Sequence, residues 1–186
     1  MGGRHQVFDD RPASGLGISG LVFCSGGAGL VYQVLWLQQL GLLFGNTSHA
    51  AAATLTAFFT GLAAGSWFWG QRAARAANPL RWYAGLELGI VVTALGYFLI
   101  CPLYHGMYPV VFEHVTTPAG RLGIKFVLAL LLVFPPAFCM GGTVPLIGQY
   151  RIRDAAAFGV TAARLYAVNT LGAALGAFVA GFFLPA

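Results

Sequence analysis

The chain contains five long apolar stretches, and this feature constrains its fold more than any other. A helix crosses the hydrocarbon core of a bilayer in about 20 residues, and each stretch reaches that length. Only 8% of the 186 residues are charged, against about 25% in an average soluble domain. The sequence therefore predicts an all-α, polytopic membrane bundle and excludes a soluble globular enzyme or a disordered chain. The five predicted helices lie at residues 16–44, 49–70, 80–103, 122–149 and 159–185.

Polar or Gly- and Pro-containing segments separate these stretches. The third of them, residues 104–120, is the longest and is expected to be an irregular loop; the fourth covers residues 151–157. Residues 1–15 form a short, charged N-terminal segment, and residues 16–186 form a single transmembrane domain. No soluble domain and no long linker is predicted.

The basic residues predict an orientation in the membrane. Lys and Arg are enriched in cytoplasmic loops. A cytoplasmic N-terminus places seven arginines inside and leaves only Arg121 and Lys125 outside. We therefore expect the cytoplasmic (inner) membrane, with the N-terminus in the cytoplasm and the C-terminus on the outer side. Because orientation explains the net charge of +5, no nucleic-acid partner is predicted.

Glycines four residues apart indicate close helix packing. Gly61 and Gly65 show this spacing in the second stretch, and Gly172 and Gly176 show it in the fifth. Small residues at this spacing let helix backbones approach each other in lipid. A transport pathway uses the same small residues, so the pattern leaves both possibilities open.

The fourth stretch contains Pro135, Pro136 and Pro145. A proline inside a helix lacks the backbone donor and clashes with a preceding carbonyl. We therefore expect the fourth helix to be kinked or broken at Pro135-Pro136. Broken helices at membrane depth often mark binding sites in transporters, although plain kinks also occur.

Two ionisable residues lie inside the predicted helices. Glu87 is the only carboxylate in them, and Arg164 is the only guanidinium clearly inside one. Each lies about six residues, or roughly 9 Å, from the cytoplasmic side. Charges at that depth cost several kcal/mol unless they are paired or hydrated. The sequence predicts an ion pair between Glu87 and Arg164; the alternative is that Arg164 reaches the headgroups and Glu87 faces a wet crevice.

Four further polar residues within the predicted helices are candidate site residues. Tyr32 and Gln33 lie in the first helix, Thr143 in the fourth and Asn169 near the middle of the fifth. Gln33 lies deep enough to need an internal partner. An interhelical hydrogen bond between Gln33 and Asn169, worth about 0.6–2 kcal/mol, is therefore predicted.

No metal or cofactor site is predicted. A G-x-G-x-x-G pattern begins at Gly15, but it lacks the preceding strand and the following acidic residue that dinucleotide binding requires. His105 and His114 are nine residues apart, which is poor spacing for a metal site. The three cysteines are far apart in apolar segments.

Five short motifs lie in order along the chain, at residues 30–37 (LVYQVLWL), 61–67 (GLAAGSW), 87–89 (ELG), 140–146 (MGGTVPL) and 164–173 (RLYAVNTLGA). Together they resemble the transmembrane domain of the membrane-bound (fused) spermidine-synthase-like family. In that family a multi-helix membrane domain precedes a cytosolic aminopropyltransferase-like domain. No residue here resembles that catalytic domain, and Gln33 stands where the family usually has Glu.

These features predict that the chain is not an enzyme on its own. We expect a non-catalytic integral membrane subunit that acts as a scaffold or anchor within a larger membrane complex. Its expected partners are membrane lipids and other integral membrane subunits. Two alternatives remain: the membrane half of a split aminopropyltransferase, which the resemblance implies, and a transport module for polyamines or small cations.

Overall fold

The computed structural model describes residues 15–45, 48–151 and 158–184. Helices take up 94% of these residues, and no strand occurs among them. All five helices are long and apolar enough to cross a membrane, which indicates membrane integration and confirms the predicted fold class. Most of the N-terminal segment 1–15 and of the break 151–157 lies outside the described residues. The helices are α1 (Gly15–Phe44), α2 (Ser48–Ala73), α3 (Pro79–His114), α4 (Pro118–Arg151) and α5 (Phe158–Phe183).

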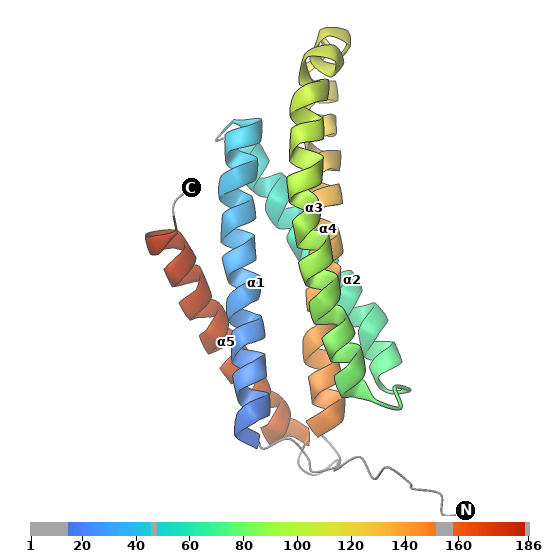
Figure 1. The fold of residues 1–186 in the computed structure, drawn as a ribbon, viewed down its shortest axis with the longest axis vertical. Helices are drawn as coiled ribbons and strands as arrows, with labels where there is room; N and C mark the ends of the chain where they lie inside the picture. Colours follow the sequence, from blue (N-terminus) through green and yellow to red (C-terminus); the bar gives the residue numbers. More distant parts are fainter. Residues whose placement is uncertain (1–14, 46–47, 152–157, 185–186) are drawn as a thin grey trace, which may run out of the picture.

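Successive helices run in opposite directions (Figure 1). The starts of α1, α3 and α5 and the ends of α2 and α4 therefore lie together, and we call this the Arg164 end. The opposite end is called the Lys125 end. α4 packs between α2 and α3, whereas α5 packs mainly against α1, on the side away from α3 (Figure 1). α1 also contacts α2 and α4, which joins the α1–α5 pair to the other three helices.

Capping residues fix where α3 and α4 begin. Asn78 and Thr117 each precede a proline that starts a helix, the position where a missing backbone donor has no cost. The Arg81 amide donates to Asn78 Oδ1 (3.2 Å), and the Gly120 amide donates to Thr117 Oγ1 (3.3 Å). These bonds satisfy backbone donors that the first helical turn leaves without a partner.

The prediction of a long irregular loop at residues 104–120 is wrong. α3 continues as a helix to His114 and α4 begins at Pro118, so only residues 115–117 connect them. The extension is held against α1, because the Tyr104 ring packs edge-on against the Phe44 ring, with centroids 6.2 Å apart. His105 and His114 therefore lie on one helix rather than on a loop.

Prolines lie inside α3 and α4 without interrupting either helix. The chain bends at residue 101, directly before Pro102. α4 runs as one helix through Pro135, Pro136 and Pro145, so the alternative of a broken fourth helix is wrong. The fully buried Pro136 lies within the packed core of the bundle, where tertiary contacts hold the helix despite the lost hydrogen bonds.

Candidate functional site

The intramembrane carboxylate Glu87 lies between α1 and α3. Ser25 of α1 donates its hydroxyl to Glu87 Oε1 at 2.9 Å. The buried hydroxyphenyl group of Tyr83, one turn earlier on α3, lies near Glu87. One carboxylate and two hydroxyl groups therefore form a small polar cluster inside the predicted hydrocarbon region. Such oxygen atoms can bind a proton or a small cation, and they can also join two helices.

The predicted ion pair between Glu87 and Arg164 is wrong. Both residues belong to the described part of the chain, and the structure places Glu87 against Ser25 of α1 instead. The Arg164 side chain is exposed and lines a hollow at the Arg164 end, next to Arg151. By residue count Glu87 and Arg164 lie at similar levels of their helices, but α3 and α5 are not packing neighbours, so the two side chains do not meet.

A second polar contact joins α1 to α3 nearer the Lys125 end. The Tyr97 hydroxyl donates to Gln39 Oε1 at 3.0 Å. The backbones of α1 and α3 do not pack closely, so this bond and the Ser25–Glu87 bond connect them through side chains. Neither contact was predicted; the available signal was a polar residue within the apolar stretch of each helix.

The predicted hydrogen bond between Gln33 and Asn169 is also wrong. Asn169 of α5 instead packs over Gly26 of α1, where a Cβ atom would lie 2.7 Å from Asn169 Oδ1. Gly26 is about two helical turns away from Gln33. Asn169 therefore contributes to the α1–α5 crossing, and Gln33 lies half-buried elsewhere on α1.

Tyr32 and Thr143 make contacts within their own helices. The Tyr32 ring stacks on Trp36, with centroids 5.5 Å apart. The buried Thr143 hydroxyl donates to the Met140 carbonyl oxygen at 2.8 Å, which satisfies its polar group locally. These contacts suit structural roles in packing the bundle.

Gly61 and Gly65 lie at the crossing of α2 and α4. A Cβ atom at Gly61 would lie 2.8 Å from the Ala137 Cβ, and one at Gly65 would collide with the backbone of Phe138. The close approach also brings the Ser66 hydroxyl within 2.8 Å of the Gly141 carbonyl oxygen, to which it donates. Both glycines therefore allow backbone contact between α2 and α4.

Gly172 and Gly176 lie at the crossing of α5 and α1. A Cβ atom at Gly172 would lie 2.8 Å from the Phe23 carbonyl carbon, and one at Gly176 would lie 2.8 Å from the Gly27 carbonyl carbon. Real Cβ atoms do not approach backbone atoms this closely. The α1–α5 contact therefore requires glycine at both positions.

The outer face of α5 carries a second row of small residues. These residues are exposed and lie on the side of the helix opposite Gly172, since successive residues turn by about 100°. Bulky exposed side chains flank them, including Tyr166 and Leu171. The row, called here the α5 outer face, consists of Ala163, Ala167, Thr170 and Ala174.

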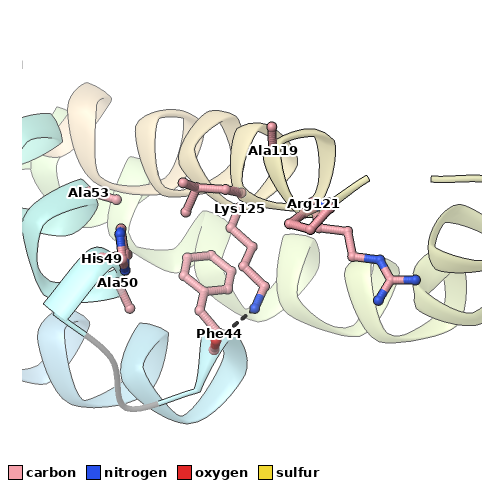
Figure 2. A pocket seen from close by; sticks show the side chains of 9 residues that line it. Phe44, His49, Ala50, Ala53, Ala119, Arg121 and Lys125 are labelled. Carbon is pink, nitrogen blue, oxygen red and sulfur yellow. Dashed lines mark hydrogen bonds between the residues drawn. The ribbon is translucent and has the colours of Figure 1, made fainter. Parts of the chain in front are cut away.

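A mainly apolar cavity of about 460 Å³ lies at the Lys125 end, between the end of α1 and the starts of α2 and α4 (Figure 2). Lys125 Nζ donates to the carbonyl oxygen of Phe44, the last residue of α1, at 2.7 Å. Arg121 Nε donates to the Val115 carbonyl oxygen at 2.8 Å, and its side chain extends away from His49 and Phe44 (Figure 2). Both cations thus hold backbone carbonyls near helix ends, which favours a structural role.

Among the described residues, no group of three or more His, Cys, Asp or Glu side chains lies together in a way that could hold a metal ion. Comparison with known proteins gives no match to a protein-family model, a curated protein or a solved structure. The resemblance to the spermidine-synthase-like family therefore rests on the five sequence motifs and stays a prediction.

Proposed function

We propose that the chain is a non-catalytic integral membrane subunit that docks a transmembrane helix of another protein on the α5 outer face. The chain would act as a scaffold or anchor within a larger membrane complex. The single observation that supports this proposal most strongly is that α5 has two small-residue faces and uses only one of them. Gly172 and Gly176 are buried against α1, whereas Ala167 and Ala174 are exposed on the opposite side.

Small residues at helical spacing permit close helix approach, and in lipid such approach supplies much of the association energy. A face used only for lipid contact has no need of small side chains. On α2, the side opposite its own glycine face is interrupted by the exposed Phe59 ring, so a helix could not approach there as closely. The α5 outer face has no such obstruction between Ala163 and Ala174.

The engagement of Glu87 also supports a structural role. Its carboxylate accepts the hydrogen bond that joins α1 to α3. The orientation that we propose, with the Arg164 end in the cytoplasm of an inner membrane, agrees with the charge distribution. Among the described residues, Arg72, Arg75, Arg81, Arg151 and Arg164 lie at that end, against Arg121 and Lys125 at the other.

Purification from native membranes in a mild detergent, followed by mass spectrometry, tests the proposal. Integral membrane proteins should co-purify with the wild-type chain, and Ala174→Leu should reduce their recovery roughly tenfold, because the larger side chain separates the helices. Ala84→Leu is the matched control, since Ala84 is an exposed small residue on α3. Recovery of the chain alone, or equal losses in both variants, would contradict the proposal. Co-purification of an aminopropyltransferase would favour the split-enzyme alternative.

We propose transport of a polyamine or small cation as the second candidate function. The observation in its favour is the polar cluster of Ser25, Tyr83 and Glu87, which offers a carboxylate and two hydroxyl oxygens inside a predicted span. Purified chain in vesicles would then take up putrescine or spermidine, and Glu87→Gln would abolish uptake. Absence of uptake by the wild-type chain would exclude this candidate.

A further inference from the structure

A hollow of about 360 Å³ lies at the Arg164 end, where the start of α1, the end of α4 and the start of α5 meet. It is distinct from the α5 outer face and from the Glu87 cluster. Among the residues that the structure describes, two arginines, two hydroxyl-bearing residues and aliphatic side chains line it. The lining consists of Leu16, Ser19, Arg151, Val160, Thr161, Arg164, Leu165 and Val168.

The hollow concentrates positive charge, with no carboxylate among its described lining residues. Arg151 comes from α4 and Arg164 from α5, and none of the described residues that line the hollow is acidic. Glu87, the carboxylate that the sequence assigns to Arg164, is hydrogen-bonded to Ser25 instead. Two guanidinium groups that share one hollow repel each other, and an anion between them converts this repulsion into attraction.

The donor groups suit a tetrahedral oxyanion. Each guanidinium presents five N–H donors in a planar fork, which matches phosphate oxygens in a bidentate manner. The hydroxyl groups of Ser19 and Thr161, on α1 and α5, belong to the same lining. Each polar side chain that the described residues contribute to the lining can therefore donate a hydrogen bond to a phosphate oxygen.

The apolar part of the lining and its position favour an amphiphile over a free ion. Leu16, Val160 and Val168 supply aliphatic surface beside the arginines. The candidate membrane spans begin at Leu16 and Gly159 and end at Arg151, so the hollow lies at a span boundary. Phospholipid phosphates lie at that level of a bilayer, outside the hydrocarbon core.

We infer that this hollow is a binding site for the phosphate group of an anionic phospholipid, held by Arg151 and Arg164. The preference for a lipid follows from the membrane integration of the chain, whereas phosphate recognition depends only on the lining. The site would fix the junction of α1, α4 and α5 to the lipid headgroup layer. It is independent of the partner helix proposed for the α5 outer face.

Native mass spectrometry of the full chain, released from a neutral detergent, tests the inference. The probes are phosphatidylglycerol as the anionic lipid, phosphatidylcholine as the zwitterionic lipid and inorganic phosphate as the free ion. The wild-type chain should retain phosphatidylglycerol at least tenfold more strongly than phosphatidylcholine. If phosphate competes with phosphatidylglycerol at equal concentration, the ligand is a soluble phosphate compound and the lipid assignment is wrong. Equal retention of the two lipids would overturn the inference altogether.

Substitutions assign the binding to the hollow. Arg151→Gln and Arg164→Gln should each weaken phosphatidylglycerol retention roughly tenfold or more, as expected for loss of a charge-assisted hydrogen-bonding group. Arg164→Lys should lose less, because it keeps the charge but not the planar fork. Arg81→Gln is the matched control, since Arg81 is exposed at the same end of the bundle but outside the hollow.

Two further measurements serve as controls for folding and for neutralisation of the arginines by the chain itself. Far-UV circular dichroism of each variant shows whether it is folded, and the Lys variant serves if a Gln variant is not. Asp154→Asn removes the acidic residue between α4 and α5 in sequence. The inference expects unchanged lipid retention in this variant. Retention that appears only in Asp154→Asn would mean that a carboxylate of the chain itself neutralises the arginines, and would overturn the inference.

Discussion

Replacing Gly172 by alanine should destabilise the protein, although alanine is the better helix former. The added Cβ would lie 2.8 Å from the Phe23 carbonyl carbon and 3.0 Å from its Cα, and closer still to the carbonyl oxygen. Carbon atoms in favourable contact are about 3.5–4.0 Å apart. The contact would therefore be about 0.5–1 Å too short. Because it involves backbone atoms of α1, no change of side-chain rotamer can relieve it.

α5 must therefore move away from α1 along much of their contact. A radial gap of about 0.5–1 Å already removes a quarter to a half of the dispersion energy of the atoms involved. Overpacking by one methyl group in a well-packed region typically costs about 1–3 kcal/mol. We expect a loss of that size, because α5 packs mainly against α1 and has few other contacts to compensate.

Equilibrium unfolding in mixed micelles, with increasing SDS and with circular dichroism as the signal, measures this loss. Gly181→Ala is the matched control, because a Cβ atom at Gly181 meets no atom within 4 Å. It should leave the free energy of unfolding unchanged or raise it by up to about 1 kcal/mol through helix propensity. The reasoning is refuted if Gly172→Ala is as stable as wild type, or if both variants change alike.

Three other predictions concern individual polar side chains, and each uses the same unfolding assay, with hydrogen exchange added for the last. The effects of Glu87→Leu and Arg164→Leu on the free energy of unfolding should be additive within about 0.5 kcal/mol, since the residues do not meet. A larger coupling energy would mean that the two residues do form an ion pair. Ser25→Ala should cost about 1 kcal/mol, because Glu87 loses its 2.9 Å donor, and this loss should vanish in Glu87→Leu. Lys125→Met should lower the free energy of unfolding by about 0.5–1 kcal/mol, because Lys125 donates to the Phe44 carbonyl at the end of α1. It should also speed amide hydrogen exchange in the last turn of α1. Unchanged exchange there would argue against a capping role for Lys125.

The helix crossings could be predicted from the sequence because their cause is local. Two glycines four residues apart place two missing side chains on one face, whatever the partner helix is. The pattern at Gly61 and Gly65, and again at Gly172 and Gly176, therefore located both backbone contacts. The partner of each pair required the topology, which the spacing does not contain.

The partners of the polar side chains could not be predicted. Counting residues from the end of a helix gives depth, and it placed Glu87 and Arg164 at similar levels. It does not give the direction in which a residue faces relative to neighbouring helices. Glu87 faces α1, where Ser25 and not Arg164 lies within hydrogen-bonding distance. Gln33 and Asn169 failed to pair for the same reason.

The loop between α3 and α4 was predicted too long because residues 104–120 are polar or contain Gly and Pro, which is typical of a break between helices. A single proline removes one backbone hydrogen bond, which a 36-residue helix tolerates when other contacts hold it. Here the Tyr104 contact with Phe44 anchors the extension. That contact joins residues 60 positions apart, so it cannot be predicted from a local sequence pattern.

Site-specific photo-cross-linking in native membranes tests the central claim most directly. A photoreactive residue at Ala174 lies on the α5 outer face, and the same residue at Ala84 lies on the exposed side of α3. We predict a discrete cross-link from position 174 to another integral membrane protein and none from position 84. Cross-links to lipid alone at position 174, or the same products from both positions, would contradict the account.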